Sequence, residues 1–274
     1  MARSVTHGGA RVILLTRDDA RSRAVAAAIH ERVPLSAIIL EEPRPTSVRR
    51  RVRRALMRSP AWSWIERALA YRRPALDRRI AAIERQLSRN AEQVFRAGAA
   101  GRLEFPAGVQ QRRTPSVNSP QIEAFLRESP PDLLLVFGTG ILRGPILSLA
   151  RLGVLNAHAS LLPRYRGTSV ELWQVLNGDL DAAGITIHFV NDGVDTGDVV
   201  HQRPTSVERG TDHFVLRARN VLAVMDDFGA TAAKVLDGTA QRRPQPPSSE
   251  RTWRSRDVTI AVKEACYRKL GYLP

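Results

Sequence analysis

Short apolar runs alternate with helical segments along most of the chain. A helical composition over residues 18–32 separates the first two runs, and a strand, helix, strand unit of this size predicts a right-handed crossover and a parallel sheet. The pattern therefore predicts an α/β fold with a doubly wound, Rossmann-like, mostly parallel sheet. The predicted strands are RVILLT (11–16), LSAIILE (35–41), DLLLVF (132–137), the start of GVLNAHASLLPRYRG (153–167), GITIHFV (184–190) and DVVHQ (198–202).

Proline and capping signals bound two further helices. Pro120 opens one helix and Pro130 ends it. Thr168 and Glu171 have the three-residue spacing of a capping box, which predicts a helix that runs through Leu176.

Further helices complete the predicted order of elements. A short helix is expected over residues 144–152 and a long one over about 211–237. The tail from about residue 240 is expected to form a short helical cap. We therefore expect one main domain at residues 1–205, with residues 206–274 packed on it.

Residues 44–113 interrupt the alternation and form a predicted helical insertion. Apolar side chains there recur at helical spacing while arginines occupy the other faces, which predicts an amphipathic helix. The apolar positions are Leu76, Ile80, Ile83, Leu87 and Val94, and the arginines are Arg78, Arg79, Arg85 and Arg89.

The net charge of +15 is concentrated in this same insertion. Residues 44–113 hold 18 arginines, no lysine and 5 acidic residues, a net charge of +13. Two interpretations stay open: a solvated arginine face on a packed helix, or a surface that attracts an anionic ligand such as a nucleotide, RNA or acidic lipid head groups. Trp62 and Trp64 would suit a membrane interface.

Composition narrows the class of protein. Cys266 is the only cysteine, which excludes an internal disulfide and a multi-cysteine zinc site, and we expect it to be a buried apolar residue rather than a nucleophile. The start MARSVTHGG lacks a signal-peptide core, and no apolar run reaches about 18 residues, so a cytoplasmic location is expected.

Candidate catalytic side chains lie where a predicted strand ends. Asn156 and His158 are two residues apart in an extended segment and therefore project to the same side. A hydrogen-bonded histidine inside the core would be the simpler explanation. The loop NDGVDTGDV (191–199) argues for a site, because Gly193 and Gly197 permit a tight backbone that presents Asp195, an acid that can orient a histidine.

With these residues assembled, the sequence resembles the folate-dependent formyltransferase family. The resemblance rests on NAHASLLPRYRG and GVDTGDVV at the family's typical separation, and extends more loosely from about residue 118 to 205. It implies that Asn156, His158 and Asp195 are catalytic, that 10-formyltetrahydrofolate is the co-substrate and that no metal is required. It also implies a folate pocket built largely from backbone groups of Phe137, Gly138, Thr139, Gly140, Ile141, Leu142, Asp192 and Gly193.

The chemistry implied by the resemblance suits these three residues. An amine attacks the formyl carbon, and negative charge develops on the formyl oxygen. Asn156 can donate an amide hydrogen to that oxygen, and a protonated His158 can supply a second, charge-assisted donor. Asp195 would orient the imidazolium and help to carry a proton from the amine to the leaving folate nitrogen.

The amine acceptor is less constrained by the sequence. TRDDARSR after the first strand lacks the glycine-rich loop of members that act on a phosphoribosyl amine. Members that act on methionyl-tRNA carry a further C-terminal barrel of roughly a hundred residues, whereas only about 70 residues follow Thr205 here. Deformylases carry an N-terminal regulatory domain, and no such domain fits before residue 11.

The best prediction is therefore formyl transfer to a small-molecule primary amine, foremost a nucleotide-linked amino sugar. Arg164, Tyr165 and Arg166 would contact an anionic acceptor or only close the loop. The alternatives are a methionyl-tRNA-type or other RNA-associated formyltransferase that uses the basic insertion, a formyltetrahydrofolate hydrolase, and an inactive member of the family.

Overall fold

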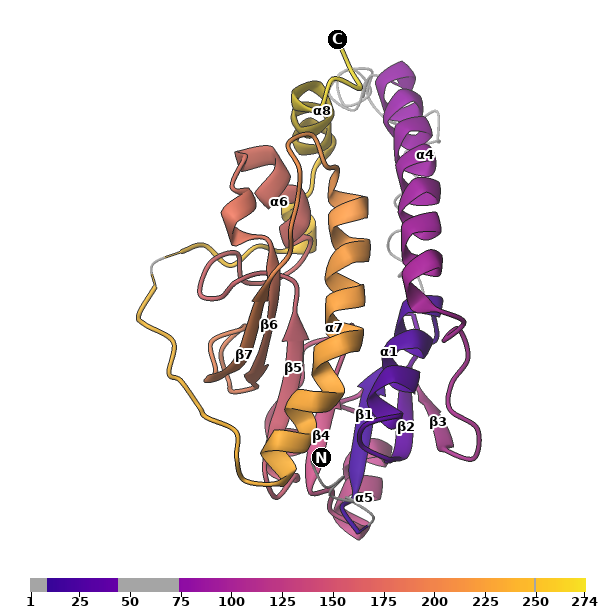
Figure 1. The fold of residues 1–274 in the computed structure, drawn as a ribbon, viewed down its shortest axis with the longest axis vertical. Helices are drawn as coiled ribbons and strands as arrows, with labels where there is room; N and C mark the ends of the chain where they lie inside the picture. Colours follow the sequence, from indigo (N-terminus) through magenta and orange to yellow (C-terminus); the bar gives the residue numbers. More distant parts are fainter. Residues whose placement is uncertain (1–8, 44–73, 249) are drawn as a thin grey trace, which may run out of the picture.

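A seven-stranded sheet forms the centre of the protein. The computed structural model describes residues 9–43, 74–248 and 250–274, and within them the strand order is β3-β2-β1-β4-β5-β6-β7 (Figure 1). The first five strands in this order are mutually parallel, and β6 and β7 are antiparallel to their neighbours. The bounds are β1 (Val12–Thr16), β2 (Leu35–Glu41), β3 (Gln110–Thr114), β4 (Leu133–Val136), β5 (Val154–His158), β6 (Gly184–Phe189) and β7 (Val199–Pro204).

Helices cover both faces of this sheet. Helices α1 and α7 pack on one face, and α5 with the 3-10 helix η1 packs on the other, each over its own apolar cluster. This layering confirms the predicted doubly wound, mostly parallel α/β fold. The helices are α1 (Ala20–His30), α4 (Pro74–Ala99), α5 (Pro120–Glu128), α6 (Val170–Asn177), α7 (His213–Leu236) and α8 (Ile260–Lys269), with 3-10 helices η1 (Gly144–Ser148), η2 (Leu180–Ala182) and η3 (Ser255–Asp257).

Six of the seven strands coincide with the predicted apolar runs, and β3 does not. Its sequence, QQRRT, is largely exposed, because β3 is an edge strand that pairs only with β2 among the described strands. An edge strand with little buried surface carries no apolar run, so the hydrophobic pattern could not find it.

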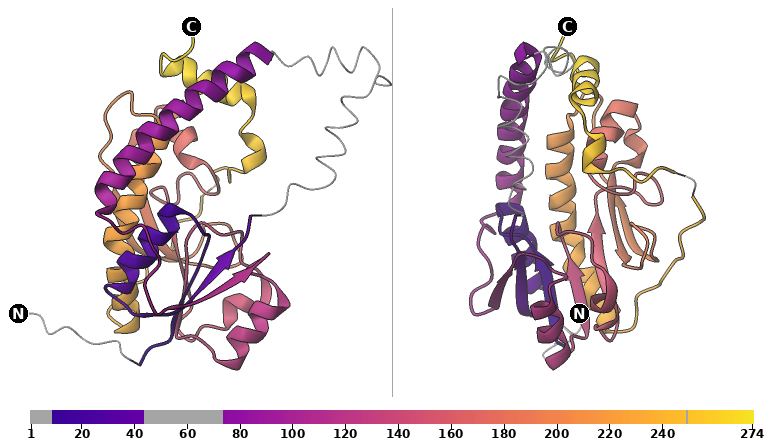
Figure 2. Two further views of the ribbon diagram at one scale, coloured as in Figure 1. Left: turned by 90° about the vertical axis from the view of Figure 1, so that its right-hand side faces the viewer. Right: turned by 180° about the vertical axis from the view of Figure 1, so that it is seen from behind.

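Helix α4 confirms the predicted amphipathic helix in the described part of the insertion. Ile80 and Leu87 are buried as expected, but Val94 is 36% exposed, so its predicted place on the apolar face is wrong. The reason is that the buried face continues through Ala91 and Phe95, which pack against the cluster shared with α7. Figure 2 shows α4 running along α7 and past the end of the sheet. Residues 44–73, with Trp62 and Trp64, lie outside the described residues.

The predicted capping box at the start of α6 is wrong. The N-cap is Ser169, in the left-handed region with φ 58°, and it makes no side-chain cap hydrogen bond. Glu171 is instead buried and bound by Arg217, with Nε and Nη2 of the arginine 3.2 and 3.1 Å from its two carboxylate oxygens. A partly exposed arginine on α7 thus binds the carboxylate that the capping box would have used.

The C-terminal part packs on the same body as the rest of the described chain. Helix α7 contributes a large share of the apolar cluster on the sheet, and α8 packs against α6 and α4. Cys266 on α8 is buried, as predicted, and burial raises the pKa of its thiol to about 11. None of the helices in the described ranges has an apolar stretch long enough to cross a membrane.

Candidate active site

The candidate catalytic side chains lie on the face of the sheet that turns away from α7. Leu155 and Ala157 on β5 pack with the α7 cluster, so the alternation of the strand places Asn156 and His158 on the opposite face. Val136 of β4 pairs with Asn156 on one side, and β6 pairs on the other. The expectation that the two side chains share a face is therefore met.

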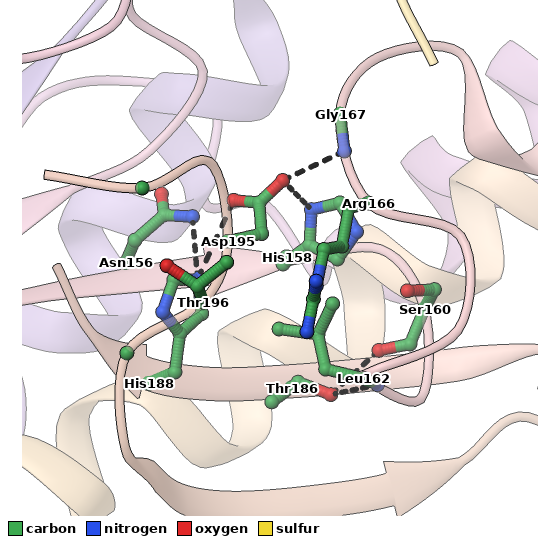
Figure 3. Close-up of polar contacts among 12 residues, drawn as sticks. Asn156, His158, Ser160, Leu162, Arg166, Gly167, Thr186, His188, Asp195 and Thr196 are labelled. Atoms are coloured by element: carbon green, nitrogen blue, oxygen red, sulfur yellow. Dashed lines mark hydrogen bonds and ion pairs between the residues drawn. The ribbon is translucent and has the colours of Figure 1, made fainter. Parts of the chain in front are cut away.

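The loop between β6 and β7 brings Asp195 to the same place. Asp195 is itself in the left-handed region, with φ 53°, and the loop folds tightly: a Cβ on Gly197 would lie 1.9 Å from the carbonyl oxygen of Phe189. The carboxylate lies between two imidazoles, with Oδ2 3.5 Å from Nδ1 of His158 and Oδ1 3.6 Å from Nε2 of His188 (Figure 3).

Asp195 is held in its ionised form. Burial on its own would raise the pKa of this carboxyl, but positive charge on His158 and His188 and the backbone N–H of Gly167, 2.8 Å from Oδ2, outweigh it. Together they hold the pKa of Asp195 well below its usual range. The site therefore keeps a fixed negative charge beside two histidines.

Both ring nitrogens of His158 face oxygen atoms of the protein. Nε2 lies 2.8 Å from the carbonyl oxygen of Tyr165, which can only accept, so Nε2 carries a hydrogen and donates it. Nδ1 faces the carboxylate of Asp195. The doubly protonated ring is the form that satisfies both contacts. A substrate oxygen would therefore have to replace the Tyr165 carbonyl before His158 could donate to it through Nε2.

His188 is a site residue that the sequence analysis did not single out. Its Nδ1 donates to the carbonyl oxygen of Phe189 at 2.8 Å, and its Nε2 lies 3.2 Å from Nδ2 of Asn156. A neutral ring accepts a hydrogen from Asn156, whereas a protonated ring donates toward Asp195. The alternation of GITIHFV was a usable signal, since Ile185, Ile187 and Phe189 face α7 and leave His188 on the catalytic face.

The predicted folate-binding loop leaves the sheet beside Asn156, directly after Val136. Buried Glu41 at the end of β2 holds this loop by accepting the N–H of Gly140 at 2.6 Å, a contact that sequence reasoning missed. Gly138 has φ 72° with open space where a Cβ would be, and the Ile141 side chain is 58% exposed. Open backbone next to an exposed apolar side chain is compatible with a flat, partly apolar ligand such as a pterin ring. The other residues predicted for this pocket are Phe137, Thr139 and Leu142, which are partly or fully buried, and Asp192 and Gly193, which are exposed.

The three residues predicted to contact the acceptor are engaged within the protein. Arg164 pairs with Asp179, and the buried Tyr165 accepts a hydrogen bond from Asn177 through its hydroxyl. Arg166 is buried and directs Nη2 to a glutamine of the C-terminal segment. Their contact with an acceptor stays a prediction.

Across the described ranges, no group of three His, Cys, Asp or Glu side chains is arranged to hold a metal ion.

Comparisons with known proteins agree with this geometry. The sequence profile described as formyl transferase matches residues 81–220. A methionyl-tRNA formyltransferase of Geobacter metallireducens is 35% identical over 139 residues, which are 50% of this chain and 44% of that protein. A second one, from Chlorobium chlorochromatii, is 34% identical over 134 residues. The chain thus matches less than half the length of these relatives.

Solved structures share the fold at low sequence identity. An N-formyltransferase of Helicobacter canadensis, crystallised with folinic acid and dTDP-3-aminofucose, superposes with a TM-score of 0.57 at 12% identity, covering 95% of this chain and 80% of that one. A glycinamide ribonucleotide transformylase 1 of Symbiobacterium toebii gives a TM-score of 0.53 at 20% identity, with 88% and 96% covered. The fold, including its C-terminal part, is therefore one that characterised proteins also adopt.

Proposed function

Because the chain belongs to the formyl transferase family, we propose that it is an enzyme that transfers a formyl group from 10-formyltetrahydrofolate to a primary amine. The observation that carries this proposal is the ionised Asp195, held between His158 and His188 and next to Asn156. A largely buried carboxylate with two imidazoles and an amide donor is an arrangement suited to acyl transfer.

Each of these groups has a task in the proposed reaction. Attack of the amine on the formyl carbon places negative charge on the formyl oxygen. With His188 neutral, Asn156 donates one amide hydrogen to Nε2 of His188 and has a second one available for that oxygen. His158 would donate the second hydrogen bond once the substrate displaces the Tyr165 carbonyl. Asp195 stabilises the imidazolium, and together with a water molecule it would relay the proton that the attacking amine loses to the folate nitrogen, which leaves as the bond to the formyl carbon breaks.

The folate would lie against the loop at residues 137–142, with backbone groups near Asp192 and Gly193 completing the pocket. This placement is supported by the register of Val136 with Asn156, which puts the loop beside the proposed formyl site. It is also supported by the exposed Ile141, which offers an apolar contact to a ring.

The first candidate acceptor is the amine of a small molecule, foremost a nucleotide-linked amino sugar. The Helicobacter canadensis protein, which was crystallised with such a sugar, shares the fold over 95% of this chain. Arg166 in the loop after β5 places positive charge next to the trio, which would suit an anionic acceptor, whereas Arg164 would have to leave Asp179 to contact one.

The test is release of tetrahydrofolate from 10-formyltetrahydrofolate in the presence of a panel of amino sugars and other amines, compared with His158→Ala. We expect release that requires both an amine and His158. Release at the same rate without any amine would indicate the hydrolase instead. No release with any amine, tRNA-bound amines included, would contradict the proposal.

The second candidate acceptor is the amine of an aminoacyl-tRNA. The relatives in sequence are methionyl-tRNA formyltransferases, and α4 carries an exposed stripe of arginines, Arg78, Arg85, Arg89 and Arg96. Their spacings of 7, 4 and 7 residues put them on one helix face over roughly 27 Å. Arg96 pairs with Glu92, and all four arginine side chains are exposed.

Binding of tRNA across a salt series tests this second candidate. Replacing Arg78, Arg85 and Arg89 by Ala should lower the slope of log affinity against log salt by about 3, because each phosphate contact releases roughly one counterion. The matched control replaces three other exposed arginines, Arg143, Arg209 and Arg256, and removes the same charge. An equal change in both variants, or no salt-dependent binding by the wild type, would reject the stripe as an RNA surface.

A further inference from the structure

The C-terminal segment at residues 240–248 and 250–253, here called the strap, reaches back from α7 to the candidate active site. It runs as an extended stretch beside the antiparallel edge of the sheet before the chain continues to α8 (Figure 1). Arg243 pairs with Val199 of β7 through two backbone hydrogen bonds of 2.8 and 2.9 Å. The strap is therefore fixed to the strand that follows the Asp195 loop.

Its far end is fixed to the loop that follows His158. Glu250 accepts the N–H of Tyr165 at 3.2 Å. Trp253 donates its N–H to the carbonyl of Arg166 at 2.9 Å and accepts the N–H of Thr168 at 3.0 Å. Its ring stacks on Trp173 with centroids 3.9 Å apart. The strap thus spans from one catalytic loop to the other.

Between these two anchors lies Gln245, whose amide group bonds to both loops. Nε2 donates to the carbonyl oxygens of Asp195, at 3.0 Å, and Gly197, at 2.8 Å. Oε1 accepts from Nη2 of Arg166 at 3.3 Å. Both amide hydrogens and the amide oxygen are used, and one of the partners is the backbone of a proposed catalytic residue.

Asp195 has a particular need for such a partner. Its backbone is in the left-handed region, which is strained for a residue other than glycine and persists only where neighbours hold it. The hydrogen bond from Gly167 fixes the carboxylate, while Gln245 holds the carbonyl of the same residue. The two contacts approach from different loops and together define where the carboxylate lies.

We propose that Gln245 is a positioning residue, which fixes the backbone of Asp195 so that its carboxylate remains between His158 and His188. This inference rests on the proposed formyl transfer, since positioning has a kinetic meaning only for that reaction. The strap is then part of the active site, although it lies 50 residues from Asp195 in the sequence.

The sharpest variant is Gln245→Glu, which keeps the size and shape of the side chain. Above the titration of the introduced carboxyl, one carboxylate oxygen keeps the contact with Nη2 of Arg166, while the other replaces the amide donor and faces the two carbonyl oxygens of Asp195 and Gly197. When protonated, the introduced carboxyl regains one O–H donor. The loss of turnover relative to the wild type should therefore shrink as the pH falls, while a purely structural defect would not follow the ionisation of this one group.

The experiment measures kcat and the KM for 10-formyltetrahydrofolate from pH 5 to 8 in the wild type, Gln245→Glu and the matched control Gln241→Glu. Gln241 lies in the same strap and is exposed. For Gln245→Glu we expect kcat about tenfold lower at pH 8, a KM within about twofold, and a deficit that narrows toward pH 5; one lost hydrogen bond near a charged group corresponds to roughly this factor. A deficit in Gln241→Glu of the same size, or full activity of Gln245→Glu at pH 8, would overturn the proposal.

A second readout does not depend on catalysis. Hydrogen exchange of the amides at residues 193–199 should be faster in Gln245→Ala than in Gln241→Ala, because only the first variant releases the Asp195 loop. If the wild type transfers no formyl group, the proposed function fails, and the exchange measurement alone decides the role of Gln245. Equal exchange in the two variants would overturn that role.

Discussion

When His188 is neutral, Asn156 can give only one amide hydrogen to a substrate, because it donates the other to Nε2 of His188. That contact fixes which end of the amide carries the donors, so the free hydrogen has a defined direction before any ligand binds. The sequence indicated Asn156, His158 and Asp195 through spacing and a glycine-rich loop. It could not indicate Glu41 or Gln245, whose roles depend on partners 99 and 50 residues away.

Another buried residue, His213 at the start of α7, makes the stability of the protein pH-dependent. Burial is the main cause that lowers the pKa of His213 to about 4, and the positive charges of Arg217 and Lys263 lower it further. The negative charge of Glu171 raises this pKa but does not outweigh the other causes. In the unfolded chain the imidazole titrates near its ordinary pKa of about 6.5. Between these values the unfolded state binds more protons, so the free energy of unfolding falls as the pH falls from 6.5 to 4.

The substitution His213→Phe should remove this pH dependence of the free energy of unfolding. We expect the wild type to lose about 2 kcal/mol more unfolding free energy than His213→Phe between pH 7 and pH 5. Urea unfolding of both proteins at the two pH values measures it. Since Nδ1 of His213 is buried without a hydrogen-bond partner, the phenyl ring should be tolerated at pH 7. An identical pH dependence in the two proteins would show that the folded state does not keep His213 neutral.

At the scale of elements, the apolar runs predicted β1, β2 and β4 well because these strands are almost entirely buried on both faces and read as continuous apolar sequence. The polar edge strand β3 escaped prediction because it lacks buried surface, and the capping box at α6 was wrong because the Glu171 carboxylate is bound by Arg217 of α7, which is 46 residues away in the sequence. The strap also escaped prediction. Its only regular features are isolated bridges such as that between Gly167 and Trp253.

That bridge supplies an element-scale prediction. A Cβ on Gly167 would lie 2.0 Å from the carbonyl oxygen of Trp253, and φ at this position is +99°. Gly210 has a similar φ of +90° with nothing near its missing Cβ. Gly167→Ala should therefore lower the free energy of unfolding by at least about 2 kcal/mol more than Gly210→Ala, because only the first substitution also forces the strap away.

Urea unfolding of the two alanine variants measures this difference. Gly167→Ala should also lose most formyl transfer, since its N–H no longer meets the carboxylate of Asp195 in the same place. Equal stability of the two variants would mean that the strap yields to the added methyl group at no cost.

At the scale of the whole molecule, the sheet and the C-terminal part form one unit around the site. β5 supplies Asn156 and His158, the loop after β6 supplies Asp195, and the strap that follows α7 joins the loops (Figures 1 and 3). The fold class could be predicted from the sequence because it follows from a repeated local pattern. The full site could not, because chain segments distant in sequence meet there without any local signature.

The central claim is that the ionised Asp195 between two histidines drives formyl transfer. Its most direct test is the single-turnover rate of transfer of an isotopically labelled formyl group from 10-formyltetrahydrofolate to the accepted amine, in the wild type and in Asp195→Asn. The substitution keeps the shape and removes the charge, so we predict a rate at least about 100-fold lower with the fold intact. A rate within about twofold of the wild type would contradict the account.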